Sequence, residues 1–147
     1  KNMATTATIT LSSGDIADNA FSISNTSTLY TAGTDTHITE TTGLGRKKVA
    51  TSSNTILLDA GLAGGIAQDV TAAKSAKVFI KNHNDRGDGT KWVNILLAAV
   101  EIGRLYGGDF MFFPWCAEDG KDIEFTCEST GGTDATETTL EYTCFYE

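Results

Sequence analysis

Apolar and polar side chains alternate one by one in two segments near the C-terminal end of this 147-residue chain. In residues 122–129 every second residue is apolar, namely Ile123, Phe125 and Cys127. Residues 138–146 repeat the pattern, with Leu140, Tyr142, Cys144 and Tyr146. A period of two buries one face of a β-strand and leaves the other in water. We therefore predict two antiparallel strands joined by a Gly-rich turn at 130–134, with an acidic outer face.

The rest of the chain favours the same class. It contains 23 Thr, 9 Ser and 15 Gly but one Pro, and the β-branched threonine favours strands. Short apolar runs recur between turn signals every 8–12 residues, which is typical of a sandwich or barrel. We predict an all-β protein: a single β-sandwich or jelly-roll-like domain over 1–147, with about eight to ten short antiparallel strands. Residues 1–20 are a candidate extended N-terminal arm.

The net charge of −8 lies in the last fifth of the chain. Residues 1–116 hold ten acids and ten bases, whereas residues 117–147 hold nine acids and one base. A phosphate backbone would require a basic stripe, so we expect no nucleic-acid partner. The composition also excludes a membrane span. The acidic region is either a solvated face or a docking face for a basic partner.

The three cysteines, Cys116, Cys127 and Cys144, are an odd number, which is poor material for a secreted disulfide framework. Cys127 and Cys144 occupy inward positions of the predicted strands, where a thiol behaves as a small apolar group. A disulfide between these two is the alternative. Residues 1–11 also lack the apolar run of a signal peptide. We expect folding in a reducing cytosol.

The sequence lacks the usual catalytic patterns. There are two histidines, neither in a metal-ligand spacing, and there is no nucleophile elbow, P-loop or dinucleotide motif. We predict no enzymatic activity and no cofactor. The weak metal candidates are Asn84, Asp85 and Asp88 in the segment 82–90, whose oxygens suit a hard cation. The same residue types are those of a plain hairpin turn, which is the favoured interpretation.

Charged and aromatic residues supply the candidate interface. Arg46, Lys47 and Lys48 form a basic run that would meet acidic residues of a neighbouring copy, in 118–122 or 137–141; the alternative is a solvated turn. Glu124 and Glu141, on the two acidic strands, are further interface candidates. Phe112 and Trp115 belong to a dense aromatic cluster, for which core packing, a subunit interface or sugar stacking on Trp92 or Trp115 are the alternatives.

Three stretches together resemble a known pattern: 107–115 (Gly-Gly-Asp-Phe-Met-Phe-Phe-Pro-Trp), 122–125 (Asp-Ile-Glu-Phe) and 140–146 (Leu-Glu-Tyr-Thr-Cys-Phe-Tyr). With the upstream strand 78–82, they resemble small structural proteins of tailed bacteriophages, particularly marine and cyanobacterial ones. The resemblance covers residues 77–147. Members of this group are virion components, either capsid decoration (cement) proteins or tail-associated β-sandwich modules, and they carry no catalytic residues.

The resemblance implies a virion protein on the capsid surface that folds in the host cytoplasm. Its expected partners are the major capsid protein and further copies of itself, as a homotrimer. Two alternatives stay open. In the first, the chain is a tail or fibre adhesion module that binds a host-surface glycan or receptor. In the second, it is a non-viral β-sandwich such as a carbohydrate-binding module.

Overall fold

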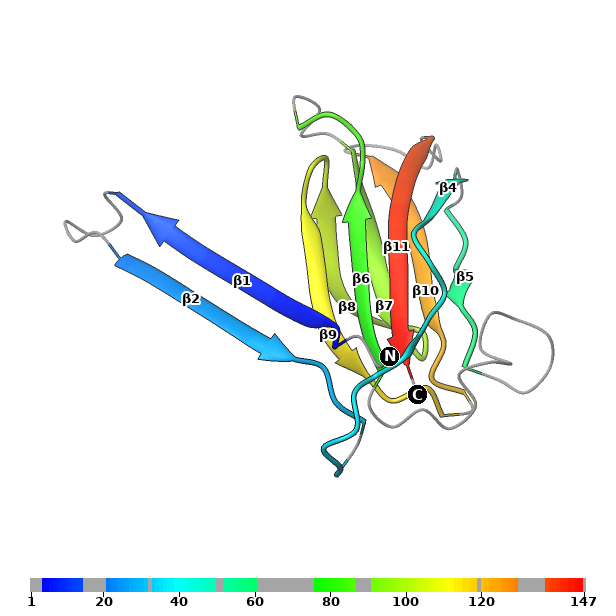
Figure 1. The fold of residues 1–147 in the computed structure, drawn as a ribbon. Helices are drawn as coiled ribbons and strands as arrows, with labels where there is room; N and C mark the ends of the chain where they lie inside the picture. Colours follow the sequence, from blue (N-terminus) through cyan, green and yellow to red (C-terminus); the bar gives the residue numbers. More distant parts are fainter. Residues whose placement is uncertain are drawn as a thin grey trace. The chain divides into compact units, whose positions relative to one another are not determined.

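The computed structural model describes residues 4–14, 21–31, 33–49, 52–60, 76–86, 91–118, 120–129 and 137–146. Within these ranges the chain forms eleven strands and no helix, and every strand pair is antiparallel (Figure 1). The predicted all-β class is confirmed. The strands are β1 (Thr6–Ser13), β2 (Phe21–Thr28), β3 (Glu40–Thr41), β4 (Gly45–Val49), β5 (Thr55–Leu58), β6 (Ala76–Asn82), β7 (Lys91–Leu97), β8 (Val100–Tyr106), β9 (Phe110–Trp115), β10 (Ile123–Ser129) and β11 (Thr138–Tyr146).

The chain divides into two compact units, residues 1–39 and 40–147. The first unit contains the candidate arm, whose strand β1 pairs along its whole length with β2. After this hairpin, Tyr30 and His37 form an isolated bridge and their rings stack with centroids 5.1 Å apart. A single domain spanning 1–147 stays a prediction; the two facing sheets described next belong to the second unit.

The second unit is built from two antiparallel sheets. The four-stranded sheet has the order β5-β10-β7-β8, and the five-stranded sheet has the order β3-β11-β6-β9, with β4 also paired to β11. Strands that follow one another in the chain therefore pass repeatedly between the sheets. Two sheets with such an order form a jelly-roll-like sandwich.

The core lies between these two sheets. Strand β6 shows the reason most clearly, because Ala76, Val78 and Ile80 are fully buried while the residues between them are half-buried. Each sheet turns its alternate apolar residues toward the other. The resulting cluster is continuous across both sheets; its members are Leu57, Leu58, Ala60, Ala76, Val78, Ile80, Val93, Ile95, Leu105, Trp115, Ala117, Ile123, Phe125, Cys127, Leu140, Cys144 and Tyr146.

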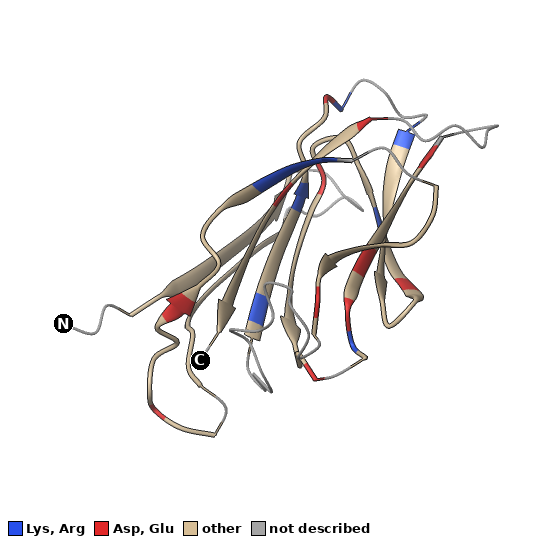
Figure 2. Ribbon diagram, turned by 90° about the vertical axis from the view of Figure 1, so that its right-hand side faces the viewer, with Lys and Arg blue, Asp and Glu red and all other residues tan. Residues whose placement is uncertain are grey.

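The sequence predicted that the two acidic strands at the C-terminal end pair with each other, but in the structure they do not. Strand β10 pairs with β5 and β7, whereas β11 pairs with β3, β4 and β6, so they lie in opposite sheets. The prediction was wrong because alternation identifies the apolar face of a strand but not its hydrogen-bonding neighbour. In consequence, the described Asp and Glu residues are spread over several strands and loops (Figure 2).

Candidate functional site

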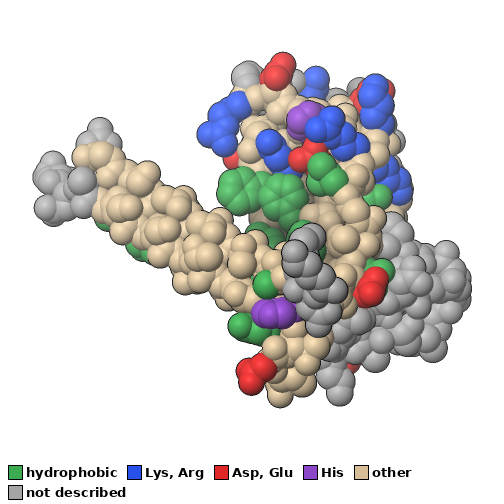
Figure 3. All heavy atoms as spheres, viewed as in Figure 1, with side chains coloured by type: hydrophobic (Ala, Val, Ile, Leu, Met, Phe, Trp, Pro, Cys, Tyr) green, Lys and Arg blue, Asp and Glu red, His purple; other side chains and the backbone are tan. Residues whose placement is uncertain are grey.

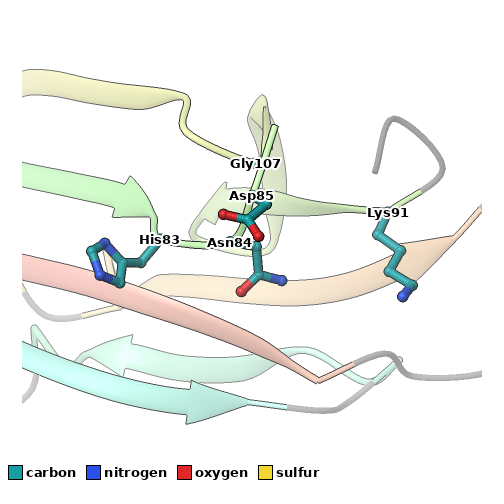
Figure 4. A pocket seen from close by; sticks show the side chains of 5 residues that line it. All are labelled: His83, Asn84, Asp85, Lys91 and Gly107. Atoms are coloured by element: carbon teal, nitrogen blue, oxygen red, sulfur yellow. The ribbon is translucent and has the colours of Figure 1, made fainter. Parts of the chain in front are cut away.

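A hollow of about 390 Å³ lies at the end of β6 (Figure 4). The side chains of His83 and Lys91 lie on opposite sides of those of Asn84 and Asp85. Gly107, from the turn between β8 and β9, completes the lining. The hollow thus combines an imidazole, an amide, a carboxylate and an ammonium group, which are groups suited to polar ligands.

Close backbone packing shapes the hollow. A Cβ atom on Gly107 would lie 2.2 Å from the carbonyl oxygen of Asp85, so glycine is required there. The buried Asn82 joins β6 to this turn: its backbone N–H donates to the Asp109 carbonyl at 3.0 Å, and its side-chain amide donates to the Leu105 carbonyl at 3.1 Å. Packing therefore explains Gly107, the first glycine of the Gly-Gly-Asp sequence.

The three weak metal candidates do not form a common site in the part of the chain that the structure describes. The Asn84 side-chain oxygen accepts a hydrogen bond from the Thr139 backbone N–H at 3.1 Å, which fixes it to β11. Asp85 is exposed, and Asp88 lies outside the described residues. Among the residues that the structure describes, no group of three His, Cys, Asp or Glu side chains is arranged to hold a metal ion. A cation site stays the weaker of the two interpretations of this segment.

The basic run lies on β4 and meets acids of the same chain. The Arg46 guanidinium donates to the Glu141 carboxylate on β11 at 2.7 Å, and this hydrogen bond lowers the pKa of Glu141. Lys48 forms an ion pair with Glu137. The Lys47 ammonium lies 5.8 Å from the ring centroid of Phe125. A contact of this run with a neighbouring copy stays a prediction, but these acidic partners are engaged within the chain.

The two aromatic candidates lie in different environments. Trp115 is 2% exposed, and its indole N–H donates to the Lys121 carbonyl at 2.9 Å, so it is a core residue with a satisfied polar group. Phe112 is half-buried on the outer side of β9, opposite Phe79 of β6. This outer surface, which we call the β6–β9 face, consists of Lys77, Phe79, Lys81, Phe110, Phe112 and Pro114.

Hydrophobic side chains on the outside of the second unit gather near Lys and Arg side chains, as seen in Figure 3. On the β6–β9 face, Phe110 is 59% exposed, and its ring lies 6.0 Å from that of Phe79. The sequence marked the aromatic cluster but did not reveal this face, because the face forms only through the register of β6 with β9.

Glu124 belongs to the outer side of the four-stranded sheet. It stands between Ile56 of β5 and Leu96 of β7, and its Oε2 atom is buried without a hydrogen-bond partner among the described residues. This orphaned carboxylate oxygen is unusual, because buried polar atoms are almost always paired.

A polar and aromatic network lies further along that outer side. The Arg104 guanidinium donates to the Asn94 side-chain oxygen at 3.1 Å, and the Asn94 amide donates to Glu128 at 2.8 Å. Arg104 also stacks 4.7 Å above the Trp92 ring, which lies 5.8 Å from the Tyr106 ring. We call these five residues the Trp92 network. The sequence did not reveal this network, because Asn94 and Arg104 meet only through the register of β7 with β8.

The first unit carries a second exposed apolar surface. In the β1–β2 register, Leu11 stands opposite Ile23, with Ile9 and Phe21 beside them on the same side of the hairpin. All four side chains are between 41% and 58% exposed. We call these four residues the hairpin apolar face. Their exposure cannot be derived from alternation in the sequence alone.

The sequence matches no protein-family model and no curated protein. Across the described ranges, no helix has the length and apolar character that crossing a bilayer requires.

Proposed function

We propose that the chain is a non-enzymatic structural protein of a bacteriophage virion, which binds the outer shell of the head as a decoration protein. The observation that carries the proposal is the set of exposed large apolar side chains on both units, including Leu11, Ile23 and Phe110. Uncovered apolar surface of this kind marks sites of protein association. The jelly-roll-like sandwich is an architecture common in viral capsid proteins, and the resemblance of residues 77–147 to phage structural proteins points the same way.

A decoration protein stabilises a shell by burying interface area across neighbouring capsid subunits. A specific interface buries about 800 Å² on each partner, and apolar surface contributes about 25 cal/mol for each Å² removed from water. The exposed apolar residues would contribute apolar area to such an interface, and the net charge of −8 favours a partner surface of the major capsid protein that is basic. Self-association as a homotrimer would repeat this contact around a symmetry axis.

Antibody labelling of particles tests this function. An antibody raised against the recombinant protein would be applied to particles purified from the biological source of the chain and imaged by electron microscopy. We expect dense label over the heads. Label restricted to tails or fibres would replace this proposal with the adhesion alternative, and particles without label would overturn the virion assignment.

The Trp92 network supports a second candidate function, the binding of a host-surface glycan. Tyr106 offers an exposed aromatic ring, and Arg104, Asn94 and Glu128 offer hydrogen-bonding groups held by one another. Aromatic rings beside fixed polar groups are the usual composition of a small-ligand site. A glycan array with the purified protein tests it: binding that Tyr106→Ala abolishes and Val100→Ala preserves would support the site, and a uniformly blank array would remove it.

A further inference from the structure

Glu124 has an environment that no other described carboxylate shares. Its side chain is half-buried, its Oε2 atom is buried without a hydrogen-bond partner, and it forms no ion pair with the described residues. The other described Asp and Glu side chains either are exposed or have a partner, such as Asn94 for Glu128 and Arg46 for Glu141. Glu124 has therefore lost part of its hydration without receiving a donor in exchange, which is an unfavourable arrangement for the free protein.

Apolar side chains stand on both sides of this carboxylate. Glu124 lies opposite Ile56 on one neighbouring strand and opposite Leu96 on the other. Leu96 is 8% exposed, whereas Ile56 is 43% exposed and belongs to the edge strand β5. A group that comes from this edge would pass along an aliphatic side chain before it reaches the carboxylate.

The two sheets of the second unit differ in the charge of their outer sides. Among the described strand residues, the outer side of the four-stranded sheet carries Glu101, Glu124 and Glu128 against one cation, Arg104, which already contacts Glu101 and Asn94. The outer side of the five-stranded sheet carries one acid, Glu141, against four cations: Arg46, Lys48, Lys77 and Lys81. A basic partner is therefore attracted to the side that holds Glu124 and repelled from the other.

We propose that Glu124 receives a lysine side chain from a basic segment of a partner protein. The four-carbon stem of lysine can lie along Ile56 while its ammonium group meets the carboxylate. Arginine fits less well, because its guanidinium pairs best with both oxygens of a carboxylate at once, and Oε2 is buried here. The inference rests on the proposed function, whose partner surface is basic, and it adds the side chain that this surface uses.

Partial burial makes Glu124 a better acceptor for a cation than an exposed carboxylate would be. Charges attract more strongly where water is partly excluded, and the dehydration of this carboxylate has already taken place in the free protein. Less free energy is then lost to dehydration when the partner binds. One lysine covers much less than a specific interface, so this contact is one anchor within a larger contact surface.

Binding of a fluorescently labelled octalysine peptide to the full chain tests the site. Anisotropy titrations at low ionic strength would compare the wild type with Glu124→Gln and with Glu40→Gln, which removes the same charge from an exposed carboxylate of the other sheet. Glu124→Gln should weaken binding about tenfold, because it removes a charge-assisted hydrogen bond. Glu40→Gln should weaken it less than about twofold. Equal losses from the two substitutions would overturn the inference, as would an octaarginine peptide that depends on Glu124 more than octalysine does.

The stability of the free protein gives an independent readout. Glu124→Leu places an apolar side chain between Ile56 and Leu96 and removes the unpaired carboxylate, so the thermal midpoint should rise while octalysine binding falls. A residue with a structural role only would not change stability and binding in opposite directions. A lower midpoint for Glu124→Leu would show that the carboxylate stabilises the folded chain, and the inference would then be wrong.

Two further measurements separate this inference from its alternatives. If Glu124→Gln abolishes binding on a glycan array and leaves octalysine binding unchanged, this surface takes a glycan and the lysine contact is overturned. Label over the particle heads, together with equal octalysine binding by Glu124→Gln and Glu40→Gln, would overturn the lysine contact and leave the proposed function intact. Particles without label, together with a selective loss for Glu124→Gln, would overturn the virion assignment and support the lysine contact with another basic protein.

Discussion

Two antiparallel strand pairs in this molecule have similar alternation and opposite environments. In the pair β6–β11, the apolar positions such as Val78 and Cys144 are fully buried between two sheets. In the pair β1–β2, the equivalent positions Leu11 and Ile23 are about half exposed. The strands resemble each other in local structure, so the difference comes from what covers them. Alternation defines an apolar face, and only the tertiary arrangement decides whether that face is buried or exposed.

Thiol chemistry should show the largest difference between the two regions. Burial raises the pKa of Cys144 to about 12, which lowers its thiolate fraction about a thousandfold relative to an ordinary thiol. In a Ser24→Cys variant, the new thiol on the exposed hairpin should react with maleimide at mildly alkaline pH while Cys144 stays unmodified. Mass spectrometry of peptides after short pulses would measure both sites. Rapid modification of Cys144 in the folded protein would show that the sandwich opens more readily than its core indicates.

Truncation of apolar side chains should separate the regions by stability. Phe125 is 1% exposed in the core of the sandwich, so Phe125→Ala should lower the free energy of unfolding by about 3–5 kcal/mol. Ile23→Ala, on the hairpin, should change it by less than about 0.5 kcal/mol. Urea unfolding curves would measure both. A large loss from Ile23→Ala in a monomeric sample would mean that the hairpin apolar face is covered within the chain.

A pair of glycine substitutions repeats the comparison at the level of the backbone. Gly107→Ala introduces a Cβ atom 2.2 Å from the Asp85 carbonyl oxygen, and this clash should cost more than about 2 kcal/mol of stability. Gly14→Ala, just after β1, meets no atom within 4 Å and should be neutral within about 0.5 kcal/mol. Thermal unfolding of the two variants provides the test, and equal midpoints would contradict the close packing of the turn.

Much of the fold could be predicted from the sequence. The alternating run at 138–146 has the bounds of β11, and the run at 122–129 differs from β10 by one residue at its start. Strand order could not be predicted, because it depends on contacts between residues far apart in the chain. The wrong pairing of β10 with β11 shows this: both have an apolar face toward the same core, and they approach it from opposite sheets.

The candidate surfaces were less predictable than the fold. Arg46 and Glu141 were identified as complementary charges, but the sequence assigned the contact to separate copies, whereas β4 and β11 bring these two residues together in one chain. Trp115 and Phe112 belong to one aromatic cluster in the sequence, yet one is core and the other lies on the β6–β9 face. In each case the residue type indicated which interactions a side chain can make. The pairing of its strand with neighbouring strands decided which residues it contacts and whether it is buried.

The Arg46–Glu141 pair gives the smallest expected effect, and its sign depends on pH. The hydrogen bond from Arg46 holds the pKa of Glu141 below its ordinary value of 4.5. A carboxyl group with a lowered pKa in the folded state stabilises the protein above its ordinary pKa, and this contribution is lost as pH falls through the lowered value.

Glu141→Gln should therefore shift the denaturation midpoint slightly downward at neutral pH and have no effect at pH well below the folded pKa. Arg46→Met should give the same pH dependence, and the double variant should be no less stable than either single one, because both remove one interaction. Ser24→Ala, on strand β2, which has no charged residue, serves as the pH-independent control. An effect of Glu141→Gln that persists at low pH would mean that packing against β4, rather than charge, closes this edge of the sandwich.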